Sequence, residues 1–274
     1  AASAGRVDLV GARGSAFPAA LVRLNEELGV PLVVLAEDAE RARELVHDLD
    51  FHNMARGGGP NDVVFFPGYE LGPYDALVPD RRTSMRRAAV LFRLAVAGDF
   101  RFLVAPAEAL VRRMTPRCDF EAACLPITCG DTVDRGELGA ALERGGYGRA
   151  PLVEEAGTYA LRGAVVDVFP PYLDRPVRLE LDGDIVERLR SFDPETQTGA
   201  DPLAELWVHP VRTNLGPMGD SERAEAASRI RAVCDAVDQP TSKTSRLIGD
   251  LLDGRLFVGA EGFAPAFHAA RGDL

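Results

Sequence analysis

Short runs of apolar residues alternate with amphipathic segments over the first third of the chain. The runs are nearly continuously apolar, which is typical of parallel strands buried on both faces; they cover residues 6–12, 31–36, 62–66 and 100–105. Between the second and third runs, apolar residues from Ala39 to Leu49 fall on one helical face, and Asp38 precedes them as the expected N-cap. A second helical pattern ends at Gly98. This succession predicts βαβ units in a doubly wound sheet.

The pattern changes in the middle third, where strands follow one another without helices. A short helix is expected over residues 134–145, where an aspartate begins the segment and glycines end it. Apolar residues then form one run at 165–169 and alternate with charged residues at 177–181. An Asp-Gly pair at 182–183 separates the alternating run from another at 184–189, which is a strong hairpin signal. A small antiparallel sheet with one helix is therefore predicted.

The last third returns to helical patterns. A loop rich in Gly and Pro at 214–220 precedes an amphipathic helix expected over 221–237, and only helical fragments follow. These changes of rhythm predict an α/β domain made of residues 1–117 and 209–274, with residues 118–208 inserted as an α+β domain.

The charge distribution supports the same division. The net charge of the chain is −11, and residues 118–208 hold −10 of it, with 8 arginines against 18 acidic residues. A nucleic-acid platform needs a basic face, so this acidic segment is expected to meet a protein instead. The chain has one lysine, Lys243, which excludes lysine-dependent chemistry elsewhere.

Composition also limits the cellular setting. No run approaches the roughly 18 apolar residues of a membrane span, so no membrane partner is expected. Arg6 and Asp8 interrupt the first residues, so no signal peptide is expected. The four cysteines show no zinc-site spacing and do not form a disulfide framework, which favours the reducing cytoplasm; they are Cys118, Cys124, Cys129 and Cys234.

A glycine-containing turn is the first candidate for chemistry. Gly11, Gly14 and Ser15 lie between the first expected strand and a helix, where backbone N–H groups can hold a phosphate. A working P-loop also needs a lysine followed by Ser or Thr, and here Ser15 is followed by Ala16. We therefore favour a structural tight turn over a weak anion site, and we expect no cofactor and no ATP hydrolysis.

Other polar residues favour structural roles. Asp167 lies in an apolar run with no second acid after it, so a structural carboxylate is favoured over a Mg²⁺ ligand. The four histidines are scattered, and no nucleophile elbow or Cys–His neighbour occurs, so neither a metal site nor a hydrolytic site is expected. Five arginines spread around the expected helix near residues 81–93. A solvated face or local ion pairs are favoured for them over contacts with DNA phosphates.

Four stretches resemble a known family in their order and spacing. They are residues 66–70 with 73–75 (FPGYE and PYD), 161–170 (LRGAVVDVFP), 177–185 (VRLELDGDI) and 190–197 (RSFDPETQ). Together they resemble the N-terminal UvrB-homology module of bacterial transcription-repair coupling factors, the Mfd family. The last two stretches are shared with UvrB itself, a second member of this group of DNA repair proteins.

The departures from UvrB favour the coupling factors. UvrB has a P-loop lysine, whereas Ser15 and Ala16 stand at that place here. UvrB also has a tyrosine-rich hairpin that inserts between DNA strands, and the expected helix at residue 81 leaves no room for it. The resemblance implies a degenerate P-loop, RecA-like parallel-sheet domain with an inserted small α+β domain. Domain 1a would then cover 1–117, the UvrA-binding-type domain 2 would cover 118–208, and domain 1b would cover 209–274.

The resemblance also implies a role in recruitment. Mfd removes stalled RNA polymerase from damaged DNA with an ATP-driven motor, and its UvrB-like domain captures UvrA for nucleotide excision repair. By this resemblance the chain is a non-catalytic UvrA-binding module. Its parent protein is then an ATP-dependent DNA translocase of the helicase family, in which other domains handle ATP, Mg²⁺, RNA polymerase and DNA.

Site residues follow from the same motifs. The arginines of the family's R-G-x-x-x-D motif and of the next R-L/V-E/D strand fall on Arg162 and Arg178, which the resemblance places at the UvrA contact. Asp182, where some relatives carry a bulky apolar residue, and Arg190 are further candidates. From the residues alone, both arginines are expected to form ion pairs within the domain. Two alternatives stay open: a nucleotide-dependent enzyme domain, or a DNA-binding module of a UvrB-like repair helicase.

Overall fold

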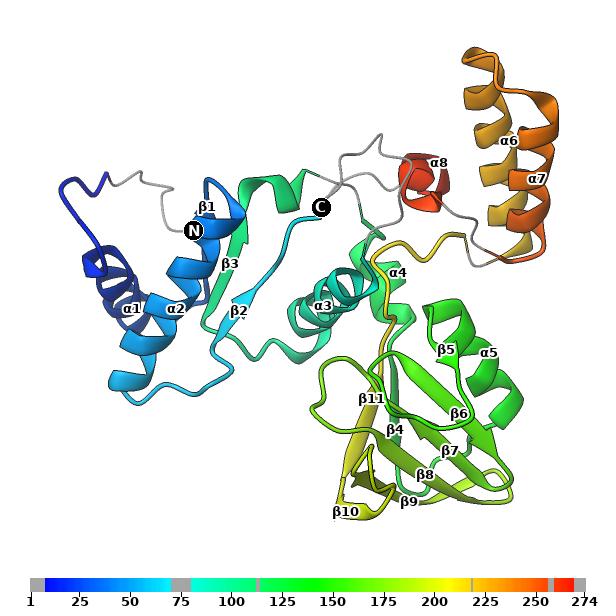
Figure 1. Cartoon of the computed structure of the whole chain (residues 1–274), viewed down its shortest axis with the longest axis horizontal. Coiled ribbons are helices and arrows are strands. Elements are labelled where there is room, and N and C mark those ends of the chain that lie inside the picture. The colour runs from blue at the N-terminus through cyan, green and yellow to red at the C-terminus, as the bar shows by residue number, and fades with distance from the viewer. Residues whose placement is uncertain (1–7, 70–79, 112–113, 218, 256–258, 269–274) are drawn as a thin grey trace. The chain divides into compact units, whose positions relative to one another are not determined.

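The computed structural model describes residues 8–69, 80–111, 114–217, 219–255 and 259–268 (Figure 1). The chain divides into two compact units. The first unit consists of Ala1–Gly68 and Asp99–Val111, and the second unit of Tyr69–Gly98 and Arg112–Leu274. Each unit has sheets and hydrophobic clusters of its own.

The first unit is built on a parallel sheet. Its described strands are β1 (Leu32–Ala36), β2 (Val63–Phe65) and β3 (Phe102–Pro106), in the order β1-β3-β2. Two helices, α1 (Ala16–Leu28) and α2 (Ala39–Ala55), share one core with these strands, and a short 3₁₀ helix, η2 (Ala107–Leu110), follows β3. Asp38 caps α2 as predicted, because its carboxylate accepts the Arg41 N–H at 2.8 Å. Three of the four expected strands and this helix are thus confirmed.

Two features of the first unit differ from the predictions. Residues 6 and 7 lie outside the described residues, and residues 8–12 form no strand. The reason is that no neighbouring strand pairs with this segment, so Leu9 and Val10 lie exposed. The sheet also differs from a doubly wound one, because α1 and α2 share a core with one face only, while Val33 and Leu35 of β1 are exposed on the other.

The second unit contains the predicted antiparallel sheet. Its described strands lie in the order β10-β9-β8-β7-β6-β5, antiparallel except for the pair β5 and β6. They are β5 (Gly148–Arg149), β6 (Thr158–Arg162), β7 (Val165–Val168), β8 (Val177–Asp182), β9 (Ile185–Phe192) and β10 (Gly199–Pro202). A two-stranded sheet joins β4 (Leu125–Thr128) to β11 (Glu205–Val208). Asp134 caps the predicted helix α5 (Arg135–Gly145), which packs on one face through Leu138 and Leu142.

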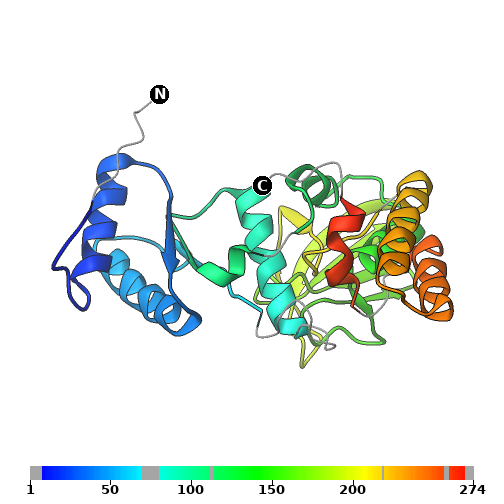
Figure 2. The ribbon, with the colours of Figure 1, turned by 90° about the horizontal axis from the view of Figure 1, so that it is seen from above.

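The helices after residue 208 belong to the second unit. They are α6 (Asp220–Ala236), α7 (Thr241–Leu252), the 3₁₀ helix η3 (Ala260–Phe263) and α8 (Ala264–Phe267). Helices α6 and α7 lie side by side (Figures 1 and 2) and bury Ile230, Ile248 and Leu251 with Phe267 of α8. No helix within the described ranges is long and apolar enough to cross a membrane.

These groupings differ from the expected division at 117 and 209. The second unit also takes in α3 (Arg81–Phe92) and the π-helical turn η1 (Arg93–Ala97), which were expected in the first domain, beside α4 (Arg117–Ala122), which lies almost wholly in the expected insert. The reason is contact rather than sequence order: Phe92 packs against Tyr172 and Trp207, and Asn214 donates a hydrogen bond to the Ala260 carbonyl. Among the described residues after 208, none adds a strand to the parallel sheet of the first unit.

Candidate functional site

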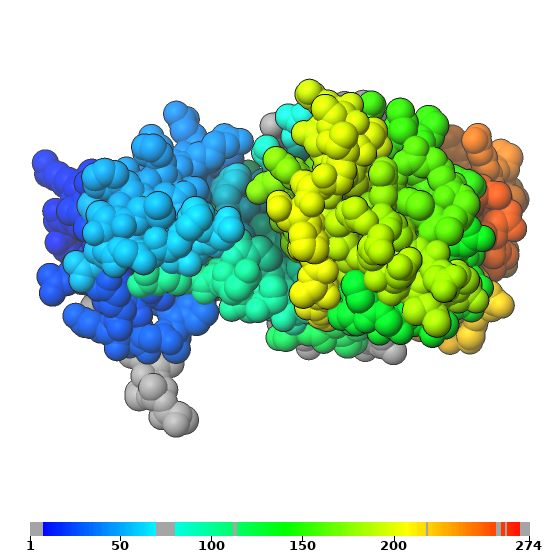
Figure 3. Space-filling view, turned by 90° about the horizontal axis from the view of Figure 1, so that it is seen from below, coloured from blue at the N-terminus to red at the C-terminus, as the bar shows by residue number. Residues whose placement is uncertain are grey.

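The six-stranded sheet of the second unit has two unlike faces. Side chains alternate along β8, so Val177, Leu179 and Leu181 point into the core beneath α5. Arg178 and Glu180 point to the opposite side. There they meet the other members of what we call the charged face, which comprises Arg162, Asp167, Arg178, Glu180, Arg188 and Arg190. The hairpin of β8 and β9, which carries part of the charged face, belongs to the green-to-yellow segment at the surface in Figure 3.

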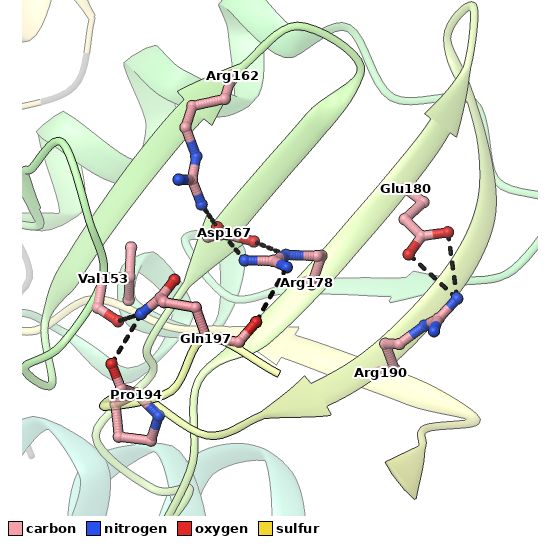
Figure 4. A network of polar contacts seen from close by, with 8 residues as sticks. All are labelled: Val153, Arg162, Asp167, Arg178, Glu180, Arg190, Pro194 and Gln197. Atoms are coloured by element: carbon pink, nitrogen blue, oxygen red, sulfur yellow. Dashed lines mark hydrogen bonds and ion pairs between the residues drawn. The ribbon is translucent and has the colours of Figure 1, made fainter. Parts of the chain in front are cut away.

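A buried carboxylate joins the two arginines that the sequence singled out. The side chain of Asp167 is 0% exposed, and Arg178 donates to it from Nε at 2.7 Å and from Nη2 at 2.9 Å. Arg162 donates to the same carboxylate from its own Nη2 (Figure 4). The structural role predicted for Asp167 is therefore an ion-paired one. Two guanidinium groups around one carboxylate leave this cluster with one net positive charge.

Strand register explains why these three side chains meet. Asp167 on β7 lies directly opposite Arg178 on β8 and opposite Ala160 on β6. Ala160 is small and buried, and Arg162 comes two residues later on the same side of β6. Its long side chain reaches back along the strand to Asp167. The spacing of 162 and 167 follows from the tight turn between β6 and β7.

Arg178 is held from several sides. Its guanidinium lies 4.6 Å from the centroid of the Phe192 ring, and its Nη1 donates to the Gln197 carbonyl at 3.5 Å. The hydrogen bond with Asp167 raises the pKa of Arg178 further above its usual value, so this side chain keeps its charge. Arg178 is 21% exposed and Arg162 is 43% exposed, so Arg178 is the anchored member of the pair and Arg162 the accessible one.

The turn at 193–197 supports this arrangement, a role that the sequence did not predict. The Asp193 carboxylate accepts the Thr196 and Glu195 N–H groups, and these bonds, the Thr196 bond above all, lower the pKa of Asp193. Gln197 has a left-handed φ of 59°, and its Nε2 donates to the Pro194 carbonyl at 2.8 Å. The turn thereby holds the Gln197 carbonyl beside Arg178 (Figure 4). In the sequence, residues 190–197 served only as part of the family resemblance, and neither this turn nor its contact with Arg178 was predicted from them.

The remaining predicted residues lie apart from this cluster. Arg190 is on the charged face, but it pairs with Glu180 at 3.1 Å, and Arg188 approaches the same carboxylate at 3.6 Å. Glu180 is 28% exposed, so it is not sealed from water as Asp167 is. Asp182 lies exposed at the end of β8, opposite Ile185 of β9, and its side chain has no hydrogen bond or ion pair within the described residues.

The glycine-containing turn lacks the strand that a phosphate loop requires. Gly11 and Gly14 have left-handed φ values of 84° and 55°, and α1 begins at Ala16 as expected. The Ser15 side chain makes no capping hydrogen bond. Because residues 8–12 form no strand, the strand–turn–helix geometry of a P-loop is not formed in the described part of this segment. Its lack of a cofactor stays a prediction.

The arginines of α3 do not form one basic stripe. Arg87 is fully buried with its guanidinium 4.5 Å from the Tyr69 ring centroid, and Arg81 donates to the Gly157 carbonyl at 2.7 Å. Arg82 and Arg86 are exposed, and Arg93 continues into η1. The side chains thus point in different directions, as their spacing predicted.

One histidine is buried in an aromatic pocket of the second unit. His209 stacks on Phe92 at 4.9 Å between centroids, and its Nδ1 lies 2.7 Å from the Pro210 carbonyl. Burial lowers its pKa to about 4, so the ring is neutral at physiological pH. Within the described residues, no three His, Cys, Asp or Glu side chains gather as a metal ion would need.

Known proteins match this chain over the same region. The family of the UvrB interaction domain matches residues 125–213, which span β4 to β11 and so the whole charged face. A transcription-repair-coupling factor of Myxococcus xanthus is 38% identical over 264 residues, covering 96% of this chain and 22% of the relative. The one of Haemophilus influenzae is 30% identical over 220 residues, covering 78% and 18%.

UvrB proteins match the chain as well. A UvrABC system protein B of a Cyanothece species is 28% identical over 231 residues, covering 80% of this chain and 33% of the relative. The chain spans about a fifth of the length of the coupling factors it matches. These similarities, with the charged face inside the matched domain, identify the chain as an N-terminal UvrB-homology module of the transcription-repair coupling factor kind.

Proposed function

We propose that this chain is a non-catalytic recruitment module that binds UvrA through the charged face. The observation that carries the proposal is the Arg162–Asp167–Arg178 cluster, which lies at the surface of the UvrB interaction domain. Arg162 and Arg178 come from separate strands and share one carboxylate, so their donors converge on a small area that a partner protein can cover.

Electrostatics supports a polar protein partner. Residues 118–208 carry a net charge of −10, yet the charged face has four arginines against two carboxylates. A locally positive patch favours one orientation of an approaching protein, and the acidic remainder of the domain repels the phosphates of a nucleic acid. The matching surface of UvrA is therefore expected to present carboxylates.

The proposed role places this chain at the start of nucleotide excision repair. In a coupling factor, binding UvrA would link RNA polymerase stalled at DNA damage to the repair proteins. We assign the ATP-driven motor and the contacts with RNA polymerase and DNA to other domains of such a parent protein. The proposed site of action is the cytoplasm.

Direct binding to UvrA of the same organism tests the proposal. Truncating an arginine that forms a buried charge pair with a partner costs about 2–5 kcal/mol, mainly through faster dissociation. Arg162→Ala and Arg178→Ala are therefore expected to weaken UvrA binding by that amount in biolayer interferometry. Arg144→Ala is the matched control, because it removes an exposed arginine of α5.

Two results contradict the proposal. One is the failure of the unchanged chain to bind UvrA at micromolar concentration and moderate salt. The other is full affinity in both variants while circular dichroism shows an intact fold, because the contact then lies elsewhere. ATP turnover above background that is lost on changing Gly14 would contradict the non-catalytic part.

A further inference from the structure

The carboxylate of Asp167 is unusual in the buried middle of a β-strand. It lies in the middle of β7 between Val166 and Val168, and all three side chains are buried. Taking a carboxylate out of water is costly, and replacing a buried ion pair by apolar residues of similar volume is often neutral or stabilising. Folding alone therefore does not explain an aspartate here.

The carboxylate orders two flexible side chains at once. Oδ1 accepts from Arg178, and Oδ2 accepts from both Arg178 and Arg162. Arg178 uses its Nε and Nη2 groups on Asp167 and rests on Phe192, so its guanidinium plane is set. Arg162 uses only Nη2, and its Nε and Nη1 form no other hydrogen bond within the described part of the chain. One fork of the Arg162 guanidinium is thus presented to solvent in a defined direction.

We infer that Asp167 is a positioning residue of the UvrA contact, an inference that rests on the proposed function. It fixes Arg162 and Arg178 before the partner arrives, so less side-chain freedom is lost on binding. The three groups together keep one net positive charge. The free fork of Arg162 matches the geometry of a single carboxylate, which we assign as the group it meets on UvrA.

A set of four chains tests this inference. UvrA affinity is measured for the unchanged chain, Asp167→Asn, the double variant Arg162→Ala/Arg178→Ala, and the triple variant with all three changes. Asparagine keeps the shape but loses the charge that holds both arginines. Coupling between contacting residues makes about a tenfold loss the expected result for Asp167→Asn. The triple variant is expected to bind as the double variant does, because Asp167 acts only through the arginines.

Two further variants separate positioning from folding and from charge. Glu180→Gln is the matched control, because it removes the carboxylate that pairs with Arg188 and Arg190 on the same face, and it is expected to change affinity less than twofold. Arg178→Lys keeps the charge and loses the two-pronged contact with Asp167. It is expected to weaken binding about as much as Asp167→Asn, and it keeps the inference testable if Asp167→Asn does not fold.

The outcomes distinguish this inference from the proposed function. One outcome contradicts the positioning role of Asp167 but agrees with the proposed UvrA contact. In that outcome the folded Asp167→Asn and Arg178→Lys variants bind UvrA with near-normal affinity, whereas the double variant binds weakly. The positioning role is also overturned if Asp167→Asn weakens UvrA binding by the same factor in the double variant as in the unchanged chain, because Asp167 then acts independently of the arginines. Normal binding by the double variant overturns both. The side-chain Nε–H resonance of Arg178, sharp in the unchanged chain and lost in Asp167→Asn, reports the ordering without UvrA.

Discussion

The two units differ in what their sheets present to solvent. In the first unit, the uncovered side of β1 carries Val33 and Leu35, which are 62% and 57% exposed. In the second unit, the side opposite α5 carries arginines that are tied to carboxylates. Eleven of the sixteen large apolar side chains exposed in the described residues belong to the first unit, although it is much the smaller of the two.

The two units therefore expose surfaces of different chemistry to water, apolar in the first unit and ion-paired in the second. Exposed apolar surface is stabilised by being covered, so a sheet face such as that of β1 is suited to lasting contacts. A face of satisfied ion pairs is stable in water by itself and can release a partner again. The second unit is therefore better suited than the first to the reversible recruitment that we propose.

The largest expected effect tests the contrast between buried and exposed positions. Leu179→Ala removes a fully buried side chain from the main core of the second unit and is expected to lower the free energy of unfolding by about 2–5 kcal/mol. Leu35→Ala in the first unit is expected to cost under about 1 kcal/mol, because its side chain is already half in water. Urea unfolding followed by circular dichroism measures both. Equal losses would show that Leu35 is covered in solution.

Acid is expected to weaken the second unit through His209. The pKa of this ring is lowered to about 4 in the folded chain from its ordinary value of 6.5, so the unfolded chain binds the proton first as pH falls. The neutral His209 ring therefore contributes its whole share to the free energy of unfolding above pH 6.5. This contribution falls by on the order of 3 kcal/mol between pH 6.5 and pH 4.

A ring that cannot titrate provides the comparison. His209→Phe keeps an aromatic ring against Phe92 and removes the protonation. The difference in unfolding free energy between the two chains, measured from pH 7 to pH 4, is expected to shift in favour of the variant as pH falls. A difference that stays constant across this range would mean that His209 is protonated without penalty.

The smallest expected effect tests whether the units unfold separately. Asp38 caps α2 in the first unit and Asp134 caps α5 in the second, each by accepting a backbone N–H at 2.8 Å. Asp38→Ala and Asp134→Ala are each expected to cost about 1 kcal/mol. Hydrogen exchange of the amides then shows Asp38→Ala speeding exchange in the first unit only, and Asp134→Ala in the second only. Equal changes in both units from either variant would indicate one cooperative structure.

Short-range patterns along the chain were enough to predict the local elements. Asp38 and Asp134 mark helix starts, the Asp-Gly pair at 182–183 marks the hairpin of β8 and β9, and alternation along β8 separates its two faces. These signals depend on residues a few positions apart, so they can be recognised in the sequence without a structure. Arg162 and Arg178 were singled out differently, through the resemblance of their motifs to a known family.

Which elements and side chains meet depends on the assembled fold. The sequence favoured a strand at residues 6–12 and a return to the first domain after 209, but strands need a pairing partner and domains need contacts between distant segments. Asp167 was readable as a structural residue, yet its bond to both arginines depends on the register of β6, β7 and β8. Register sets which side chains face one another across strands, and it is a property of the assembled sheet rather than of any single segment.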